Sequence, residues 1–256
     1  MAMSFRFLAA VASLLLAPSA AGAQDVDGFS ARSFKAANGV TMPYRLFIPS
    51  AEARKKALPL VVYLHGSGGI GDDNLKQISG GNATGTHVWT TPDAQRRHPT
   101  YVLAPQLPQG AQWGAPGSDA LPSHAEALVQ LIAALTREFS LDPDRIYLTG
   151  QSLGGGGTWD IIGKRPDLFA AAVPLCGYGN PSRVTAARRL AIWAFHGAQD
   201  PLVPVTESRD LVGALRAVGS PVKYTEYPDV GHDVWTRAYV DPSLADWLFG
   251  QRRTIP

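Results

Sequence analysis

Residues 150–154 read Gly-Gln-Ser-Leu-Gly and place Ser152 in the pattern G-x-S-x-G. The apolar stretch 146–149 predicts a buried strand before this turn, and a helix is predicted to follow it through Ile162. A strand, a tight turn and a helix form a nucleophile elbow, in which a strained backbone presents the serine hydroxyl outward. The alternative is a glycine-rich turn whose serine only caps the helix, since the short pattern also arises by chance.

A nucleophilic serine needs a base that accepts its proton and an acid that orients the base. Asp200 follows a predicted strand at residues 190–195, and His232 follows another at residues 222–227. Polar groups gather at the carboxyl ends of strands in an open parallel sheet, so both side chains are expected near Ser152. Their order along the chain, Ser then Asp then His, is that of an α/β-hydrolase. We therefore predict Ser152 as nucleophile, His232 as base and Asp200 as acid.

Other acidic and imidazole groups fit these roles less well. Asp229 is the alternative acid, but it lies three residues from His232 and suits a turn. Structural or solvated roles are expected for the histidines that precede the elbow, begin a helix or face the sheet: His87, His98, His124 and His196.

The segment 65–69, His-Gly-Ser-Gly-Gly, follows a predicted strand at residues 58–64. Its glycines allow backbone N–H groups to converge on an anion, which favours an oxyanion hole made by the N–H groups of Ser67 and Leu153. A phosphate-binding loop is the alternative, but no G-K-[ST] follows. His65 is expected to brace the loop. Trp113 and Trp235 are predicted to wall a substrate cleft, with aromatic packing as the alternative.

The N-terminal 23 residues have the features of a cleaved signal peptide. Arg6 gives a positive start, residues 7–17 are apolar, and Ala-Gly-Ala at residues 21–23 suits a cleavage site. The expected mature chain, residues 24–256, is therefore secreted or periplasmic. Its single cysteine, Cys176, allows no intramolecular disulfide and is expected to be a small buried group. The net charge of +2 with no basic block makes nucleic acid an unexpected partner.

Strands alternate with helices along the rest of the chain, which predicts one α/β domain with a mostly parallel sheet, helices on both faces and an antiparallel N-terminal edge. The edge is a hairpin over residues 34–48 that turns at Asn38-Gly39. The connection after the strand at 169–175 spans only residues 176–189. It is too short for a lid domain, so Ser152 is expected in an open cleft. Further predicted elements are a strand at 101–104 and helices at 121–139, 205–218 and 242–249.

The sequence resembles the α/β-hydrolase superfamily over nearly the whole mature chain. It is most similar to secreted carboxylesterases of the group that includes feruloyl esterases and polyhydroxybutyrate depolymerases, a group often labelled predicted peptidases because of its similarity to prolyl oligopeptidase. The matching positions are residues 43–46, 64–68, 105–106 and 150–155, Asp200, residues 231–232 and Trp235.

This resemblance implies ester hydrolysis through an acyl-enzyme and requires no cofactor and no metal. The expected substrate is a small-molecule or oligosaccharide ester, such as a feruloyl or acylated-sugar ester. An insoluble polymer is less expected, since the cysteine pair and the substrate-binding domain of secreted depolymerases are not found. After signal cleavage no membrane association is expected, and the oligomeric state stays open. One alternative is a serine peptidase of the prolyl-oligopeptidase type, because the same catalytic residues hydrolyse amides and esters. The other is a non-catalytic binding module with the same fold.

Overall fold

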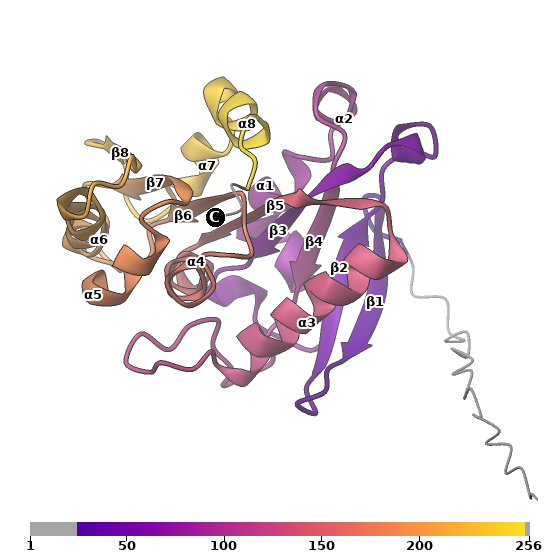
Figure 1. Ribbon diagram of the computed structural model, residues 1–256, viewed down its shortest axis with the longest axis horizontal. Coiled ribbons are helices and arrows are strands. Elements are labelled where there is room, and N and C mark those ends of the chain that lie inside the picture. Colours follow the sequence, from indigo (N-terminus) through magenta and orange to yellow (C-terminus); the bar gives the residue numbers. More distant parts are fainter. Residues whose placement is uncertain (1–24, 254–256) are drawn as a thin grey trace, which may run out of the picture.

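A computed structural model describes residues 25–253, which form a twisted eight-stranded sheet with helices on both faces (Figure 1). The predicted signal peptide at residues 1–23 lies outside the described residues. The strands follow the order β1-β2-β4-β3-β5-β6-β7-β8 across the sheet. Their bounds are β1 Phe29–Lys35, β2 Thr41–Phe47, β3 Leu58–Leu64, β4 Tyr101–Pro105, β5 Leu141–Gln151, β6 Ala171–Leu175, β7 Ala191–Gly197 and β8 Lys223–Tyr227.

The antiparallel edge is the predicted hairpin of β1 and β2. Gly39, with φ of +88°, provides the left-handed residue of its turn, a conformation that glycine adopts without steric cost. Phe29 pairs with Phe47 at the open end, so β1 begins five residues before the predicted start at residue 34. β2 then pairs antiparallel with β4 and joins the hairpin to the rest of the sheet.

The remaining six strands are parallel, as predicted. β3 is buried at every residue, which explains its uninterrupted apolar sequence. Because these strands run in one direction, the residues that follow β3, β5, β7 and β8 all emerge at the same edge of the sheet. The strand order and directions are those of the α/β-hydrolase fold.

The helices cover the sheet in two layers, each with its own apolar core. One core includes Leu128 of α3, Ile161 of α4 and Leu211 of α6 against one face, and the other includes Ala238 of α7 and Leu244 of α8 against the opposite face. In Figure 1 these two sets lie below and above the sheet. The bounds are α1 Ala83–His87, α2 Pro92–Arg97, α3 Ser123–Glu138, α4 Leu153–Lys164, α5 Pro181–Val184, α6 Val205–Ala217, α7 Trp235–Ala238 and α8 Pro242–Phe249.

The connection after β6 forms no cap over the sheet. It contains α5 and a single 3₁₀ turn at Thr185–Ala187. Ser152 accordingly keeps partial exposure. Of the helices within residues 25–253, none combines the length and the apolar composition needed to cross a bilayer.

A buried ion pair fixes the long loop between β4 and α3 to helix α4. The Nζ of Lys164 donates to Oδ2 of Asp160 (2.8 Å) and to the carbonyl oxygens of Ala115 and Ala120 (3.0 Å each). The N–H of Ala115 also donates to Asp160. The two side chains are only 7% and 2% exposed, so neither charge is solvated by water.

Replacing Lys164 with methionine should lower the free energy of unfolding by about 3–5 kcal/mol, because Asp160 would stay buried without its cation. Urea denaturation of the two proteins measures this difference. The exposed pair Arg96–Asp93, with side chains 70% and 68% exposed, provides the matched control. Arg96→Met should cost less than about 1 kcal/mol. Equal losses in the free energy of unfolding for the two variants would contradict the claim that burial makes the Lys164–Asp160 pair important for stability.

Candidate active site

Ser152 lies at the turn between β5 and α4 in a backbone conformation that non-glycine residues rarely adopt, with φ of 53° and ψ of −116°. Its N–H donates to the carbonyl oxygen of Leu175 on β6 (3.0 Å), which fixes the turn against the neighbouring strand. A Cβ at Gly154 would overlap the carbonyl oxygen of Leu64, and one at Gly155 would overlap that of Leu175. Gly154 and Gly155 are therefore required for the close approach of α4 to the sheet.

Ser152, His232 and Asp200 form a continuous hydrogen-bonded chain. The hydroxyl of Ser152 lies 2.8 Å from Nε2 of His232, and Nδ1 of His232 lies 2.7 Å from Oδ2 of Asp200. The carboxylate can only accept, so the proton of the neutral imidazole is on Nδ1 and Nε2 is free to accept from the serine. The residues come from three loops at the carboxyl edge of the sheet. The structure thus brings together the three side chains that the sequence singled out.

The carboxylate of Asp200 is fully buried and held as an anion. Its Oδ1 accepts the N–H groups of Leu202 and Val203 (2.9 Å each). Burial alone would raise the pKa of Asp200, but these two hydrogen bonds and the one from His232 outweigh it and lower that pKa below its usual range. The alternative acid, Asp229, points elsewhere and pairs with Arg237 at the surface (3.0 Å).

His196, expected to be structural, also contacts the acid. Its Nε2 lies 3.0 Å from the carbonyl oxygen of Val203 and 3.2 Å from Oδ2 of Asp200, and its Nδ1 lies 2.7 Å from the hydroxyl of Ser208. An N–H on Nε2 and a hydroxyl donor on Ser208 satisfy all three contacts. Burial lowers the pKa of His196, which favours this neutral form. The side chain ties the loop of Asp200 to helix α6.

The loop after β3 approaches the elbow from the other side. A Cβ on Gly66 would lie 3.6 Å from the Cβ of Ser152, so the backbone of this loop lies next to the nucleophile. Ser67 begins a 3₁₀ turn, and Leu153 begins α4. The first N–H groups of a helix have no partner within the helix and are available to an incoming oxygen. Both predicted oxyanion donors therefore lie close to Ser152.

A buried polar network behind this loop was not predicted. Oδ1 of Asn82 accepts the N–H of Gly66 (3.0 Å) and lies 3.0 Å from the hydroxyl of Tyr63. The same hydroxyl lies 2.8 Å from Oε1 of Gln151, the residue before Ser152, and Nε2 of Gln151 donates to Gly81. The network connects the elbow to the oxyanion loop. No local sequence pattern marks Asn82. It lies 69 positions from Gln151 in the sequence, and the two side chains are connected through the hydroxyl of Tyr63.

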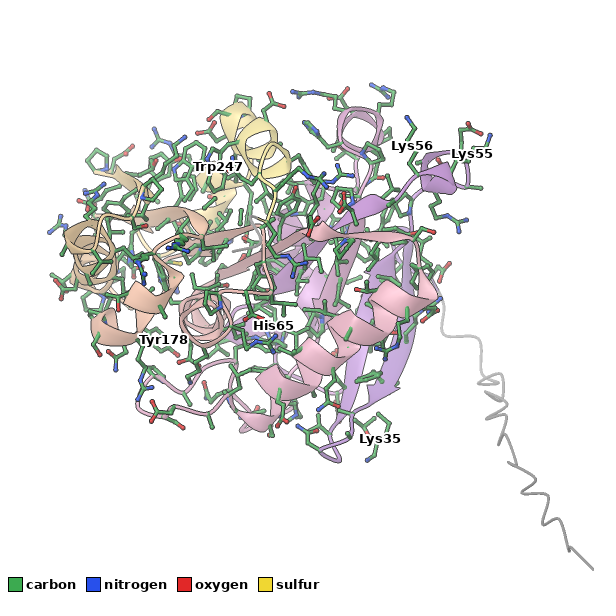
Figure 2. All side chains as sticks on the ribbon, viewed as in Figure 1. Lys35, Lys55, Lys56, His65, Tyr178 and Trp247 are labelled. Carbon is green, nitrogen blue, oxygen red and sulfur yellow. The ribbon has the colours of Figure 1, made fainter. Side chains whose placement is uncertain are left out.

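His65 braces the oxyanion loop, as the sequence suggested. Its Nδ1–H donates to the carbonyl oxygen of Gly66 (2.7 Å), and its Nε2 accepts the N–H of Leu107 (3.0 Å). Figure 2 shows His65 inside the fold, whereas labelled lysines such as Lys35 and Lys56 project from the surface. Burial lowers the pKa of His65 to about 4, so the ring is neutral near pH 7.

This burial makes stability depend on pH. The pKa of His65 is about 4 in the folded protein, whereas an unfolded histidine titrates near ~6.5. The unfolded chain therefore binds the extra proton first, and stability falls as the pH is lowered from about 6.5 to about 4, by up to about 3 kcal/mol. Urea denaturation across this pH range should show the loss. The free energy of unfolding of the His65→Gln variant should fall less steeply as the pH is lowered. Alternatively, NMR of the native protein should show this ring neutral at pH 5.5, and a protonated ring there would contradict the account.

The tryptophan predictions are only partly supported. Trp113 has no exposed surface: it packs edge-on against His65 and its indole N–H donates to the carbonyl oxygen of that residue (3.3 Å). The prediction that Trp113 walls the substrate cleft is therefore wrong, because substrate cannot reach a side chain beneath the loop. Trp235 is partly exposed and packs edge-on against the ring of His232, with 5.5 Å between centroids. It stays a candidate for the wall.

Within residues 25–253, one group of side chains has the composition of a metal site: Cys176, Asp200 and His232, whose candidate ligand atoms lie within 4.8 Å of one another. Two of the three already hydrogen bond to each other. Burial raises the pKa of the Cys176 thiol well above its usual range. A metal ligand must be the thiolate, so this environment does not favour a metal. As expected from the sequence, Cys176 is a small buried group.

Comparison with known proteins places the chain among hydrolases. A model of the dienelactone hydrolase family matches residues 46–239. The poly(3-hydroxyalkanoate) depolymerase C of Paucimonas lemoignei is 33% identical over 127 residues, which cover 46% of this chain and 28% of that protein. The bifunctional acetylxylan esterase/xylanase XynS20E of Neocallimastix patriciarum is 26% identical over 171 residues, 66% of this chain and 23% of that protein. The chain thus spans less than a third of either relative.

The crystal structure of a thermostable esterase is 39% identical and superposes with a TM-score of 0.83, covering 89% of this chain and 64% of that one. The resemblance to the α/β-hydrolase superfamily is confirmed by the family match and by this structural likeness.

Proposed function

The chain belongs to the dienelactone hydrolase family, and we propose that it is a serine carboxylesterase. The observation that carries the proposal is the hydrogen-bonded chain from Ser152 through His232 to Asp200 at a strained strand-to-helix turn. A weak nucleophile beside a base, with the base oriented by a buried carboxylate, is the arrangement that activates a serine hydroxyl. The similarity to a thermostable esterase supports esters as the substrate class.

In the proposed reaction, Oγ of Ser152 attacks the ester carbonyl while Nε2 of His232 takes the hydroxyl proton. The negative charge on the carbonyl oxygen is stabilised by the N–H groups of Ser67 and Leu153. The bond from the carbonyl carbon to the alcohol oxygen then breaks, and His232 gives its proton to the departing alcohol. Water repeats the sequence on the acyl-serine and releases the acid. Asp200 stays ionised throughout and stabilises the imidazolium.

We propose soluble esters with a bulky alcohol part as substrates, among them acylated or feruloylated sugars. Ser152 is partly exposed and no helical cap covers it in the described part of the chain. Trp235, packed against His232, offers an apolar surface beside the reacting group. The acetylxylan esterase activity in the name of one relative is consistent with an acylated sugar.

The test compares paired substrates that share one acyl group, a p-nitrophenyl ester and the matching p-nitroanilide. The proposal predicts a much larger kcat/KM for the ester, because an anilide amine is a poorer leaving group than p-nitrophenolate and needs a site shaped for amides. A ratio near one, or cleavage of the anilide alone, would support the peptidase alternative. Cleavage of neither would favour a non-catalytic binding module. A panel of acetylated xylose, methyl ferulate and p-nitrophenyl acetate then identifies the preferred ester.

A further inference from the structure

A second concave site lies at the edge of the sheet opposite to Ser152. It is a cleft of about 810 Å³. Ala170 and Ala191, which lie at the amino ends of β6 and β7, contribute to its wall, together with Pro221 before β8. Ser152 follows the carboxyl end of β5, which runs parallel to β6. The cleft is therefore separated from the catalytic groups by the length of the strands.

Arginines predominate among the charged residues that line this cleft. Four of its lining residues are arginines and only Asp167 is acidic: Arg188, Arg189, Arg252 and Arg253. The carboxylate of Asp167 is already occupied by two hydrogen bonds from Arg165. A chain with a net charge of only +2 thus concentrates cations in one concave site.

Two of these arginines are paired and two are not. Arg252 donates to Asp142 (3.1 Å), and Arg253 donates to Asp144 (3.1 Å). The exposed guanidinium groups of Arg188 and Arg189 make no ion pair or hydrogen bond with any residue among positions 25–253. A guanidinium presents five N–H donors in a fork that matches carboxylate and phosphate oxygens. Two such forks on one wall are available to an anion.

Much of the rest of the wall is apolar. Pro166, Ala186 and Pro221 are lining residues with accessible surface, and Phe169, Ala170 and Leu190 lie buried behind them. The volume of about 810 Å³ lies within the range of clefts that bind small organic molecules. An inorganic ion would use the arginines but leave the apolar part of the wall in contact with water. The site suits a molecule with an anionic group and an apolar body.

We propose that this cleft binds an organic anion, with its carboxylate or phosphate group on Arg188 and Arg189 and its apolar body against Pro166 and Pro221. The site is independent of ester hydrolysis, because it lies at the opposite edge of the sheet from Ser152 and shares no residue with the catalytic chain. Since the contact is between exposed charges, affinity should fall as the salt concentration rises.

Isothermal titration calorimetry of the full chain with phenyl phosphate, phthalate and inorganic phosphate tests the proposal. Saturable binding of either organic anion, at least about tenfold tighter than inorganic phosphate, is the expected result, and the better of the two identifies the anionic group. The double variant R188Q/R189Q should bind it at least about tenfold more weakly and hydrolyse p-nitrophenyl acetate like the wild type. The control K56Q/R137Q removes the same charge from exposed positions outside the cleft and should bind normally; of the two residues, Lys56 is labelled in Figure 2.

Three outcomes would overturn the proposal. The first is no saturable binding of either organic anion. The second is equal weakening by K56Q/R137Q, which would indicate attraction to net charge alone. The third is binding that R188Q/R189Q leaves unchanged while ester hydrolysis is competitively inhibited, which would place the anion at Ser152.

Discussion

Replacing Ser152 with alanine is expected to lower kcat for p-nitrophenyl acetate by a factor on the order of 10⁴ to 10⁶. The substitution removes one hydroxyl, whose one hydrogen bond within residues 25–253 is the bond that it donates to Nε2 of His232, and leaves the backbone of the elbow in place. Circular dichroism and the midpoint of urea unfolding should therefore match the wild type. Steady-state hydrolysis, followed by release of p-nitrophenolate, measures the loss.

The control is Ser243→Ala, which removes an exposed hydroxyl near the start of α8 that bonds Asp241. It should keep kcat within about twofold of the wild type, since it touches no residue of the catalytic chain. Turnover by the Ser152 variant that equals this control would contradict the assignment of the nucleophile.

The second large effect is expected from Asp200→Asn. The amide oxygen can still accept the N–H groups of Leu202 and Val203, but the amide nitrogen then faces Nδ1 of His232 as a donor. Nδ1 must accept, so the imidazole proton moves to Nε2 and the base can no longer take the proton of Ser152. The same change in another serine hydrolase lowers kcat about 10⁴-fold, and we expect a loss of that order here.

Asp229→Asn is the matched control, because Asp229 is the alternative acid suggested by the sequence and the chemical change is the same. Its carboxylate is exposed and pairs with Arg237, so kcat should change by less than about twofold. A greater loss in the Asp229 variant than in the Asp200 variant would reverse the assignment of the acid. The two variants together therefore separate orientation of the base from a general effect of charge.

The sheet and the hydrogen-bonded chain from Ser152 to Asp200 could be predicted because their signals are local. Gly150 and Gly154 mark the elbow within five residues, and Asp200 and His232 each directly follow a strand with an apolar pattern. Parallel strands bring their carboxyl ends to one edge of the sheet. The strand assignment alone therefore predicts that His232 meets Asp200, 32 residues away, and Ser152, 80 residues away. The early start of β1 was missed because Ser33 stands where the alternation of residues 29–32 calls for an apolar residue, which weakens the strand pattern.

The side-chain environment could not be predicted in the same way. Trp113 lies in an irregular loop with no periodicity, so its sequence gave no indication that the ring turns inward beneath His65. The contacts of Tyr63 with Asn82 and Gln151 join segments 19 and 88 residues apart through side chains alone. Similarly, the arginines of the second cleft come from separate connections that gather only when the amino ends of β6 and β7 pack together. Such groupings depend on tertiary structure rather than on pattern.

The most direct test of the central claim is to treat the folded protein with a fluorophosphonate and locate the adduct by mass spectrometry of its peptides. The reagent phosphonylates a serine, with loss of fluoride, only where a base activates the hydroxyl and an oxyanion site receives the phosphonyl oxygen. We predict one adduct per chain, on Ser152, formed rapidly in the wild type and lost in Asp200→Asn under the same conditions. An unmodified Ser152 in active protein, or an adduct on another serine, would contradict the proposed mechanism.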